Sequence, residues 1–581
     1  MWEHFQEGVQ PHADVAMPPA PRDLNQKWFD PAWRADYLDW YVAHSSLMAD
    51  MLPVANTQLG PGSLAAILGG VFEGGEDTIW IHPDPNYTDD IVFNPDHPNY
   101  LLHKDLLKAC RQKAQGHYYV GMPDLMEGLD VMAAIKGTDR VLLDTVMQPE
   151  RLEHQMQQIN DIYFQVFDAL YDIIREGDEM AFCYFSLWAP GRMTKLQSDI
   201  STMISTDDYR RFVQPFIREQ CQKIDYTLYH LDGVGAMRHL DALLEIEELN
   251  AIQWTPGVGE PQGGSARWYD LYKKILAHGK SVMACWVTLD ELRPLLDNIG
   301  GEGVHLEMDF HNEQEVEQAM RIIEAYRSHD EVDDEVREII RLVESQPTDR
   351  IPVADGAMDS MTQQQPTQTR SPAERLFQAI LDGRREDATT ATREAIAQAI
   401  APQDLINGEM IRAMSEVGRR FQEGKAFVPQ LLMAGRAMKA ALGILKPMMG
   451  GKANTALGKV VIGTVKGDLH DIGKNLVASM LEGCGFEVVN IGIDVSADTF
   501  IQAVKAHQPD ILCMSALLTT TMGYMKEVIG ALERAGIRNQ VKVMVGGAPV
   551  TQGFADEIGA DGYSDNANAA VSVAKQLLGK L

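Results

Sequence analysis

The sequence predicts an α/β protein in which a (β/α) barrel is followed by a helical bundle and then by a doubly wound parallel sheet. Three observations predict this fold class. Strand-like and helical patterns alternate before residue 345, only helical periodicity occurs over 372–452, and the alternation returns over 453–581. A chain of 581 residues exceeds the size of one hydrophobic core, so we expect two to four domains.

In the N-terminal domain, residues 1–345, short strand-like runs are each followed by a helical pattern. The clearest runs are AFCYFSLW, YTLYHLD, AIQWTP, SVMACWV and GVHLEMD. Successive strand–helix units of this kind predict a (β/α) barrel.

A segment without apolar periodicity follows this domain. Residues 346–371 are rich in Gln, Thr, Pro and Asp, a composition typical of a flexible linker. Directly after it, Ser371 and Glu374 form the S-x-x-E pattern of a capping box, with proline at the first helical position. Apolar residues then recur at helical spacing, which predicts a bundle of about four helices over 372–452.

Over 453–581 the runs VVIGTV, GFEVVNIGI, ILCMSAL and VKVMVGGA alternate with helical stretches. Their continuous apolar character favours parallel strands that are buried on both faces of a doubly wound sheet.

The composition excludes several classes of function. A net charge of −32 argues against a nucleic-acid or anionic-membrane partner. The six cysteines form no C-x-x-C pair, which argues against a disulfide framework or a zinc knuckle. The N-terminal residues show no signal-peptide pattern and no run is long enough to span a membrane, so we expect a cytoplasmic protein.

The stretch GTVKGDLHDIGKNLV places Asp468, His470 and Gly473 at a strand-to-helix corner. Two further strands end in small residues, in MSALLTTTM and in VGGAPVT. Three such strand ends form a crevice in which an extended ligand could lie. The glycine spacing fits neither a P-loop nor a dinucleotide fingerprint.

These residues resemble the motifs of cobalamin-binding domains with a Rossmann-like fold. Asp468, His470 and Gly473 match D-x-H-x-x-G, Ser515 and Leu517 match S-x-L, and the pair Gly546-Gly547 matches the glycines along the nucleotide tail. The helical stretch VGRRFQEGKAFVPQLLMAGRAMKAAL resembles the cap of methionine-synthase-type corrinoid modules.

The resemblance implies a role for each residue. His470 would be the lower axial ligand of cobalt, Asp468 would accept a hydrogen bond from its other ring nitrogen, and Thr521 would extend that relay. Ser515 would bond the buried base of the cofactor. The glycines 473, 546 and 547 would admit its tail, and apolar cap residues would cover its upper face, namely Phe427, Val428 and Leu432.

The N-terminal domain resembles the uroporphyrinogen-decarboxylase-like superfamily, which includes zinc-dependent methyltransferases that act on corrinoid proteins. The matching stretches are LGPGSLAAILGG, LQSDISTMIS, DYRRFVQPFIREQ and YHLDGVGAMRHLDALLEI. The resemblance implies a (β/α)8 barrel.

This chain departs from the zinc-binding pattern of that superfamily. The H-x-C position reads His230-Leu231-Asp232, and the late strand offers Glu307 and Asp309 instead of cysteine. Two interpretations stay open. In one, His230 with Asp232, Glu307 or Asp309 holds zinc, and in the other these residues bind a polar substrate without metal.

Further candidates lie near strand ends. Tyr184 and Asp199 are candidate catalytic residues beside His230 and Asp232, and Tyr184 and Trp254 either stack on a methylated substrate or belong to the core.

The resemblances together imply a corrinoid-dependent methyltransferase that moves a methyl group between a small molecule and bound cobalamin through Co(I) and methyl-Co(III). Its expected partners are a small-molecule methyl donor, an acceptor such as a folate or a thiol, and a reductive activator protein. The alternative is a non-catalytic corrinoid carrier or sensor with a ligand-binding barrel. A decarboxylase-like enzyme is disfavoured because the barrel segments are acidic.

Overall fold

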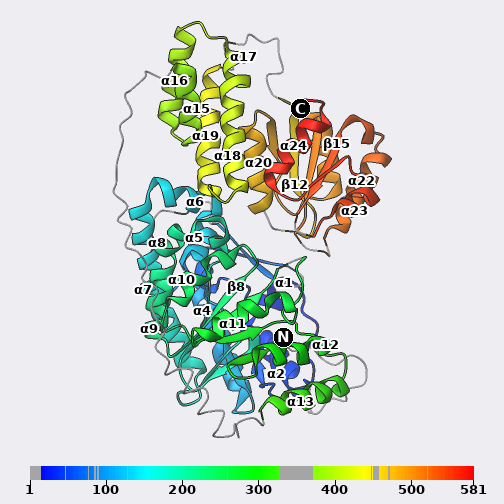
Figure 1. The fold of residues 1–581 in the computed structure, drawn as a ribbon. Coiled ribbons are helices and arrows are strands. Elements are labelled where there is room, and N and C mark those ends of the chain that lie inside the picture. The colour runs from blue at the N-terminus through cyan, green and yellow to red at the C-terminus, as the bar shows by residue number, and fades with distance from the viewer. Residues whose placement is uncertain are drawn as a thin grey trace, which may run out of the picture. The chain divides into compact units, whose positions relative to one another are not determined.

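The computed structural model describes residues 15–327 and 371–580, except 46, 76–77, 84–86, 88–89, 127, 258, 446–447, 449–456, 469–471, 518, 520 and 548. The chain forms two compact units, one from residues up to 135, 155–199 and 210–327, the other from 136–154, 200–209 and 371–580 (Figure 1). The predicted linker lies outside the described residues apart from Ser371. No described helix has both the length and the apolar character needed to cross a membrane.

The strands of the N-terminal part form two main sheets. One has the order β1-β4-β5-β6 and the other the order β11-β10-β9-β8-β7, in which every neighbouring pair is parallel. The strands are β1 (Val54–Ala55), β4 (Tyr119–Met122), β5 (Met180–Phe182), β6 (Leu187–Ala189), β7 (Met193–Gln197), β8 (Tyr226–Asp232), β9 (Ala251–Thr255), β10 (Ser281–Ala284) and β11 (Val304–Leu306), with a separate hairpin of β2 (Val71–Gly74) and β3 (Ile79–His82).

Helices separate most of these strands, which confirms the α/β class. They are α1 (Leu24–Phe29), α2 (Pro31–Ala43), α3 (Ser63–Ile67), α4 (Pro98–Ala114), α5 (Gly128–Lys136), α6 (Thr138–Met147), α7 (Pro149–Ile174), α8 (Thr206–Phe212), α9 (Gln214–Lys223), α10 (Leu240–Leu244), α11 (Tyr269–Ala277), α12 (Leu289–Ile299) and α13 (Glu313–Arg327). The strand pairings among the described residues leave the ring open, so closure of the barrel stays a prediction.

The part of the second unit that starts at residue 371, called the C-terminal unit here, begins with helices, as the sequence predicts. Ser371 caps α15 through the expected capping box, because its hydroxyl accepts from the Glu374 N–H at 3.2 Å and the Glu374 carboxylate accepts from the Ser371 N–H at 2.8 Å. The helices are α15 (Pro372–Leu381), α16 (Arg385–Ala397), α17 (Pro402–Asp404), α18 (Ile411–Gln422) and α19 (Val428–Leu445).

A parallel five-stranded sheet follows, with the order β13-β12-β14-β15-β16 (Figure 1). Its elements are β12 (Lys459–Thr464), α20 (Ile472–Gly483), β13 (Glu487–Asn490), α21 (Ala497–His507), β14 (Ile511–Ser515), α22 (Gly523–Arg534), β15 (Lys542–Gly546), α23 (Gln552–Ile558), β16 (Gly562–Ser564) and α24 (Ala567–Leu577). This order is that of a doubly wound, Rossmann-like sheet and confirms the prediction.

Each face of this sheet has its own core. Val460 and Ile462 of β12 pack with Leu431 and Met438 of α19 in one cluster, so the helical cap and the sheet share a core. The intervening Val461 belongs to the cluster on the opposite face. This alternation explains the continuous apolar run in the sequence, since both faces of the strand are buried.

Gly547 follows β15 and has a φ of +126°. A Cβ atom at this position would lie 1.8 Å from the carbonyl oxygen of Ala516, which follows β14. Any side chain is therefore excluded both by the backbone conformation and by the neighbouring strand end.

We expect Gly547→Ala to lower the free energy of unfolding of the C-terminal unit by about 3 kcal/mol or more, since strain and overpacking add. The measurement is chemical denaturation followed by circular dichroism. Gly553→Ala is the matched control, because Gly553 lies in α23 with its nearest neighbour 3.9 Å from the added Cβ. That control should be neutral or stabilising by up to about 1 kcal/mol. If the two variants are equally stable, the added Cβ atom at Gly547 does not clash with the carbonyl oxygen of Ala516.

Candidate functional site

The first candidate site lies at the carboxyl edge of the C-terminal sheet. The chain leaves β12 toward β13 on one side, and β14 lies on the other, so the strand order reverses between β12 and β14. Thr464, Ser515 and Gly546 are paired in one row across β12, β14 and β15. Ligands of doubly wound sheets bind at such a switch point, beyond the carboxyl ends of the strands.

Asp468 is fully buried beside this edge. Its Oδ2 accepts hydrogen bonds from the Leu517 N–H and from the Thr521 hydroxyl, both at 2.7 Å. These bonds connect the loop after β12 to the loop after β14. Three residues that the sequence assigns to one site are thus held in direct contact.

The other predicted residues of this site are placed as follows. His470 lies outside the described residues. Gly473 is exposed at the start of α20, and a Cβ atom there would meet nothing within 4 Å, so open space adjoins this turn. In the cap, Val428 and Leu432 are buried, and Phe427 is half-buried.

The sequence interpretation missed a polar group at the edge of this site. Lys474 is 3% exposed, and its ammonium donates to the side-chain oxygens of Asn475, at 2.5 Å, and Asn490, at 2.9 Å. These bonds join the first turn of α20 to the end of β13. In the sequence, Lys474 directly follows Gly473 of the D-x-H-x-x-G motif, and this position could have identified it.

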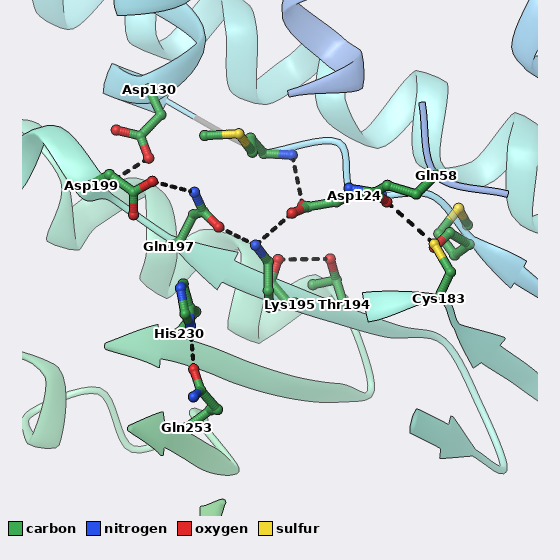
Figure 2. Close-up of polar contacts among 12 residues, drawn as sticks. Gln58, Asp124, Asp130, Cys183, Thr194, Lys195, Gln197, Asp199, His230 and Gln253 are labelled. Atoms are coloured by element: carbon green, nitrogen blue, oxygen red, sulfur yellow. Dashed lines mark hydrogen bonds and ion pairs between the residues drawn. The ribbon is translucent and has the colours of Figure 1, made fainter. Parts of the chain in front are cut away.

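The second candidate site lies at the carboxyl ends of β7, β8 and β9. Strand register pairs His230 with Gln197 on one side and with Gln253 on the other. Figure 2 shows these side chains together with Lys195 and Asp199. Since alternate residues of a strand share a face, Asp232 lies on the same face of β8 as His230.

Asp199, His230 and Asp232 converge in this site. One ligand atom from each lies within 4.8 Å of the others, and Asp199 is solvent-accessible while the other two are half-buried. A nitrogen and two carboxylate oxygens are a donor set that zinc accepts. The cluster is therefore able to hold a divalent cation or to bind a polar substrate.

The surroundings disfavour charge on all three groups. Although Asp199 reaches solvent, the protein around its carboxylate displaces much of the water there and, with the neighbouring Asp130 carboxylate, raises the pKa of Asp199 well above its usual range. Burial raises the pKa of Asp232. Burial, together with Lys195, lowers the pKa of His230 to about 3, so its imidazole is neutral at physiological pH. A bound cation would favour the ionised carboxylates.

The buried ammonium of Lys195 is linked to this site through hydrogen bonds. Lys195 and Asp124 are 2% and 1% exposed and form an ion pair at 2.5 Å. The Lys195 ammonium also bonds the oxygen of Gln197, whose Nε2 donates to Asp199 Oδ2 at 3.0 Å (Figure 2). Burial disfavours the Lys195 ammonium, but Asp124 outweighs this effect and the pKa of Lys195 is raised.

Tyr184 forms an aromatic wall of the site. The Lys195 ammonium lies 4.7 Å from the centre of its ring, and the His230 ring centre lies 6.1 Å away. Burial raises the pKa of the Tyr184 phenol, so the hydroxyl is neutral. The next residue, Phe185, also approaches His230 and has a φ of +63°, a conformation that non-glycine residues rarely adopt.

Of the predicted metal ligands, the structure brings His230 and Asp232 together, and Asp199 joins them. Asp199 takes the place that the sequence interpretation gave to Glu307 and Asp309. Glu307 instead neighbours the Cys285 thiol, whose pKa is raised by burial and by this carboxylate, and Asp309 is exposed. Trp254 is fully buried against Trp268, at 5.1 Å between ring centres, so it belongs to the core.

The supporting residues of this site were also missed by the sequence interpretation. Lys195, Gln197 and Asp199 recur with a period of two in MTKLQSD, and Gln253 interrupts the apolar run AIQWT. Polar residues on one face of a buried strand could have identified these supporting residues from the sequence.

Lys195→Met should lower the free energy of unfolding by about 3–5 kcal/mol, because the Asp124 carboxylate stays buried without its partner. Denaturant titration measures this. Adding Asp124→Asn should recover part of the loss. Lys274→Met, which removes the exposed ion pair with Asp241 at 2.5 Å, is the control and should cost less than about 1 kcal/mol. A similar cost for both lysines would contradict this account.

Thr521→Val removes one of the two donors that satisfy Asp468, and the loss should be about 1–3 kcal/mol. Thermal unfolding of the full chain measures it. Thr519 lies in the same loop and is exposed, so Thr519→Val should change little. If both variants melt like the unchanged protein, the bond from Thr521 does not stabilise the fold.

Comparisons with known proteins agree with the first site. Two models described as B12 binding domains match residues 372–446 and 458–572. Trimethylamine corrinoid protein 2 of Methanosarcina acetivorans is 47% identical over 33% of this chain and 88% of its own length. Dimethylamine corrinoid protein of Methanosarcina barkeri is 45% identical over 35% of this chain and 98% of its own length.

A solved cobalamin-binding protein from Desulfitobacterium hafniense is 36% identical, with a TM-score of 0.31, over 35% of this chain and 98% of that chain. The two corrinoid proteins from Methanosarcina carry the conclusion, since this chain covers most of their length. Through residues 372–446 and 458–572, the chain belongs to the family of corrinoid proteins with B12-binding domains.

Proposed function

We propose that this chain is a corrinoid-dependent methyltransferase in which the N-terminal unit is the catalytic domain and the C-terminal unit is its methyl carrier. The observation that carries the proposal is the convergence of Asp199, His230 and Asp232 at one sheet edge, in the same chain as a corrinoid-binding unit. Linking the two would raise the effective concentration of the carrier at the catalytic site.

The residues of the first site fit cobalamin. The buried Asp468 carboxylate accepts hydrogen bonds from Leu517 and Thr521. The backbone at Gly547 lies against Ala516, and open space adjoins Gly473. When bound, cobalamin supplies a cobalt centre that accepts and releases methyl groups. His470 would bind this cobalt, and Asp468, which accepts the hydrogen bond from Thr521, would fix the orientation of that imidazole.

Further contacts to the cofactor are proposed from the positions of the strand ends. Ser515 and Gly546, which end neighbouring strands, would adjoin the nucleotide tail, with Leu517 positioned by its bond to Asp468. Phe427, Val428 and Leu432 would cover the opposite face with apolar side chains and exclude water from it.

In the N-terminal unit, Asp199, His230 and Asp232 would hold a divalent cation such as zinc. The donor set fits, because His230 is neutral and carboxylates supply the other ligands. When bound, the ion supplies a Lewis acid that polarises a heteroatom of the substrate. Tyr184 would position the methylated group against its ring face.

We further propose that the two N-terminal sheets form one closed (β/α)8 barrel of the uroporphyrinogen-decarboxylase-like type. Eight strands, β1, β4, β5 and β7–β11, follow one another with intervening segments, and β5 contacts β7 across the break between the sheets. The converging groups lie at the carboxyl ends of the strands, where barrel enzymes place their active sites.

The methyl donor is a small methylated molecule, and the final acceptor is a folate or a thiol. Methylated amines are the first donors to test, because the relatives are named as corrinoid proteins of trimethylamine and dimethylamine. A reductive activator protein would restore the reduced corrinoid.

The test is an absorbance assay on the full chain reconstituted with cobalamin and reduced. Methylamines, methoxylated aromatics, methyl sulfides and chloromethane are added separately, and methylation of the corrinoid is followed. One donor should react, and His230→Ala should abolish the reaction while cobalamin stays bound. Arg267→Ala is a control outside the cluster.

Other outcomes separate the alternatives. If no donor reacts but a folate or thiol removes methyl from methylated corrinoid, the N-terminal unit unloads the carrier. If the chain catalyses neither reaction, it is a corrinoid carrier or sensor rather than an enzyme. Failure to bind cobalamin would contradict both assignments.

A further inference from the structure

The side chain of Gln253 is fully buried between His230 and β10. Its Nε2 donates to the Thr255 hydroxyl at 2.7 Å and to the Cys285 sulfur at 2.9 Å. A primary amide has two N–H groups, and these two bonds use both. The Gln253 oxygen is therefore the atom that contacts His230 Nδ1 (Figure 2).

The neighbouring thiol fixes the direction of these bonds. Burial and the neighbouring Glu307 carboxylate raise the pKa of the Cys285 thiol, so the thiol keeps its proton, the carboxylate attracts that proton, and the sulfur accepts from Gln253. Reversal of the Gln253 amide would place its oxygen against a sulfur whose proton is already committed to Glu307. The chain of donors therefore has one direction, from His230 toward Glu307.

We infer that the chain of hydrogen bonds through Gln253 and Cys285 to Glu307 fixes His230 as the Nδ1–H tautomer. An amide oxygen can only accept, so Nδ1 must carry the proton. The lone pair then resides on Nε2, the ring nitrogen that does not contact Gln253 and is available to a cation held together with Asp199 and Asp232. Gln253 is thus a positioning residue for the cation proposed above, and this inference rests on that proposed site.

This role replaces the one that the sequence suggested for Glu307. A carboxylate three hydrogen bonds removed from the imidazole would not bind the cation but would set the polarity of the groups that orient its ligand. Ligating histidines commonly donate their second nitrogen to a carbonyl, carboxylate or water, and loss of that partner weakens metal binding about 10- to 100-fold.

The experiment compares the full-length protein with Gln253→Met and Gln253→Glu. Nitrogen NMR of the metal-free, histidine-labelled chain reports the His230 tautomer, assigned by the signal that His230→Ala removes. Zn²⁺ affinity is measured by competition with a chromophoric chelator. Gln253→Met should lose the Nδ1–H preference and bind Zn²⁺ about 10- to 100-fold more weakly, whereas Gln253→Glu keeps an acceptor and should preserve both.

Gln197→Met is the matched control, since Gln197 is the register neighbour on the other side of His230 and donates to Asp199. It should leave the tautomer unchanged. The inference is overturned if His230 carries its proton on Nε2, or if Gln253→Met keeps both the tautomer and the affinity. A third outcome separates the cation from the positioning role. The unchanged protein could bind no Zn²⁺ while it and Gln253→Glu still show the Nδ1–H tautomer and Gln253→Met does not. In that case the proposed cation site is wrong, but Gln253 still sets the tautomer of His230.

Discussion

The direction of parallel strands is the constraint on which both sites depend. When strands run parallel in register, their carboxyl ends meet at one edge, and residues at equal depth form rows across the sheet. The row Gln197, His230 and Gln253 arises in this way, as does the row Thr464, Ser515 and Gly546. Segments far apart in the sequence therefore supply neighbouring side chains.

Buried charge is the second constraint, and each site resolves it with fixed partners. Asp468 receives two donors from the loop of another strand, and Lys195 has Asp124 and Gln197 around it. Without such partners the desolvation of these groups would favour unfolding. The same bonds leave little freedom of orientation, which suits groups that have to meet a ligand in one geometry.

Sequence reasoning predicted the parts of the protein that depend on local pattern. The alternating elements, the capping box at Ser371 and the corner at Asp468 follow from periodicity and residue type, and the cofactor follows from three ordered motifs. It grouped His230 with Glu307 rather than with Asp199 as a metal ligand, because periodicity assigns a residue to a face but does not give its reach across neighbouring strands. The pairing of Lys195 with Asp124, 71 positions earlier, had no local signal.

The core shared by α19 and β12 has a consequence for any motion of the cap. Leu431 and Met438 of the cap belong to one apolar cluster with Val460 and Ile462 of the sheet, α19 contacts α20, and Lys439 pairs with Glu482 of α20 at 3.2 Å. Peeling the cap helix from the sheet would rehydrate this apolar contact, so the two parts behave as one cooperative body. A motion that separated the cap from the sheet would therefore cost the free energy of this shared apolar core.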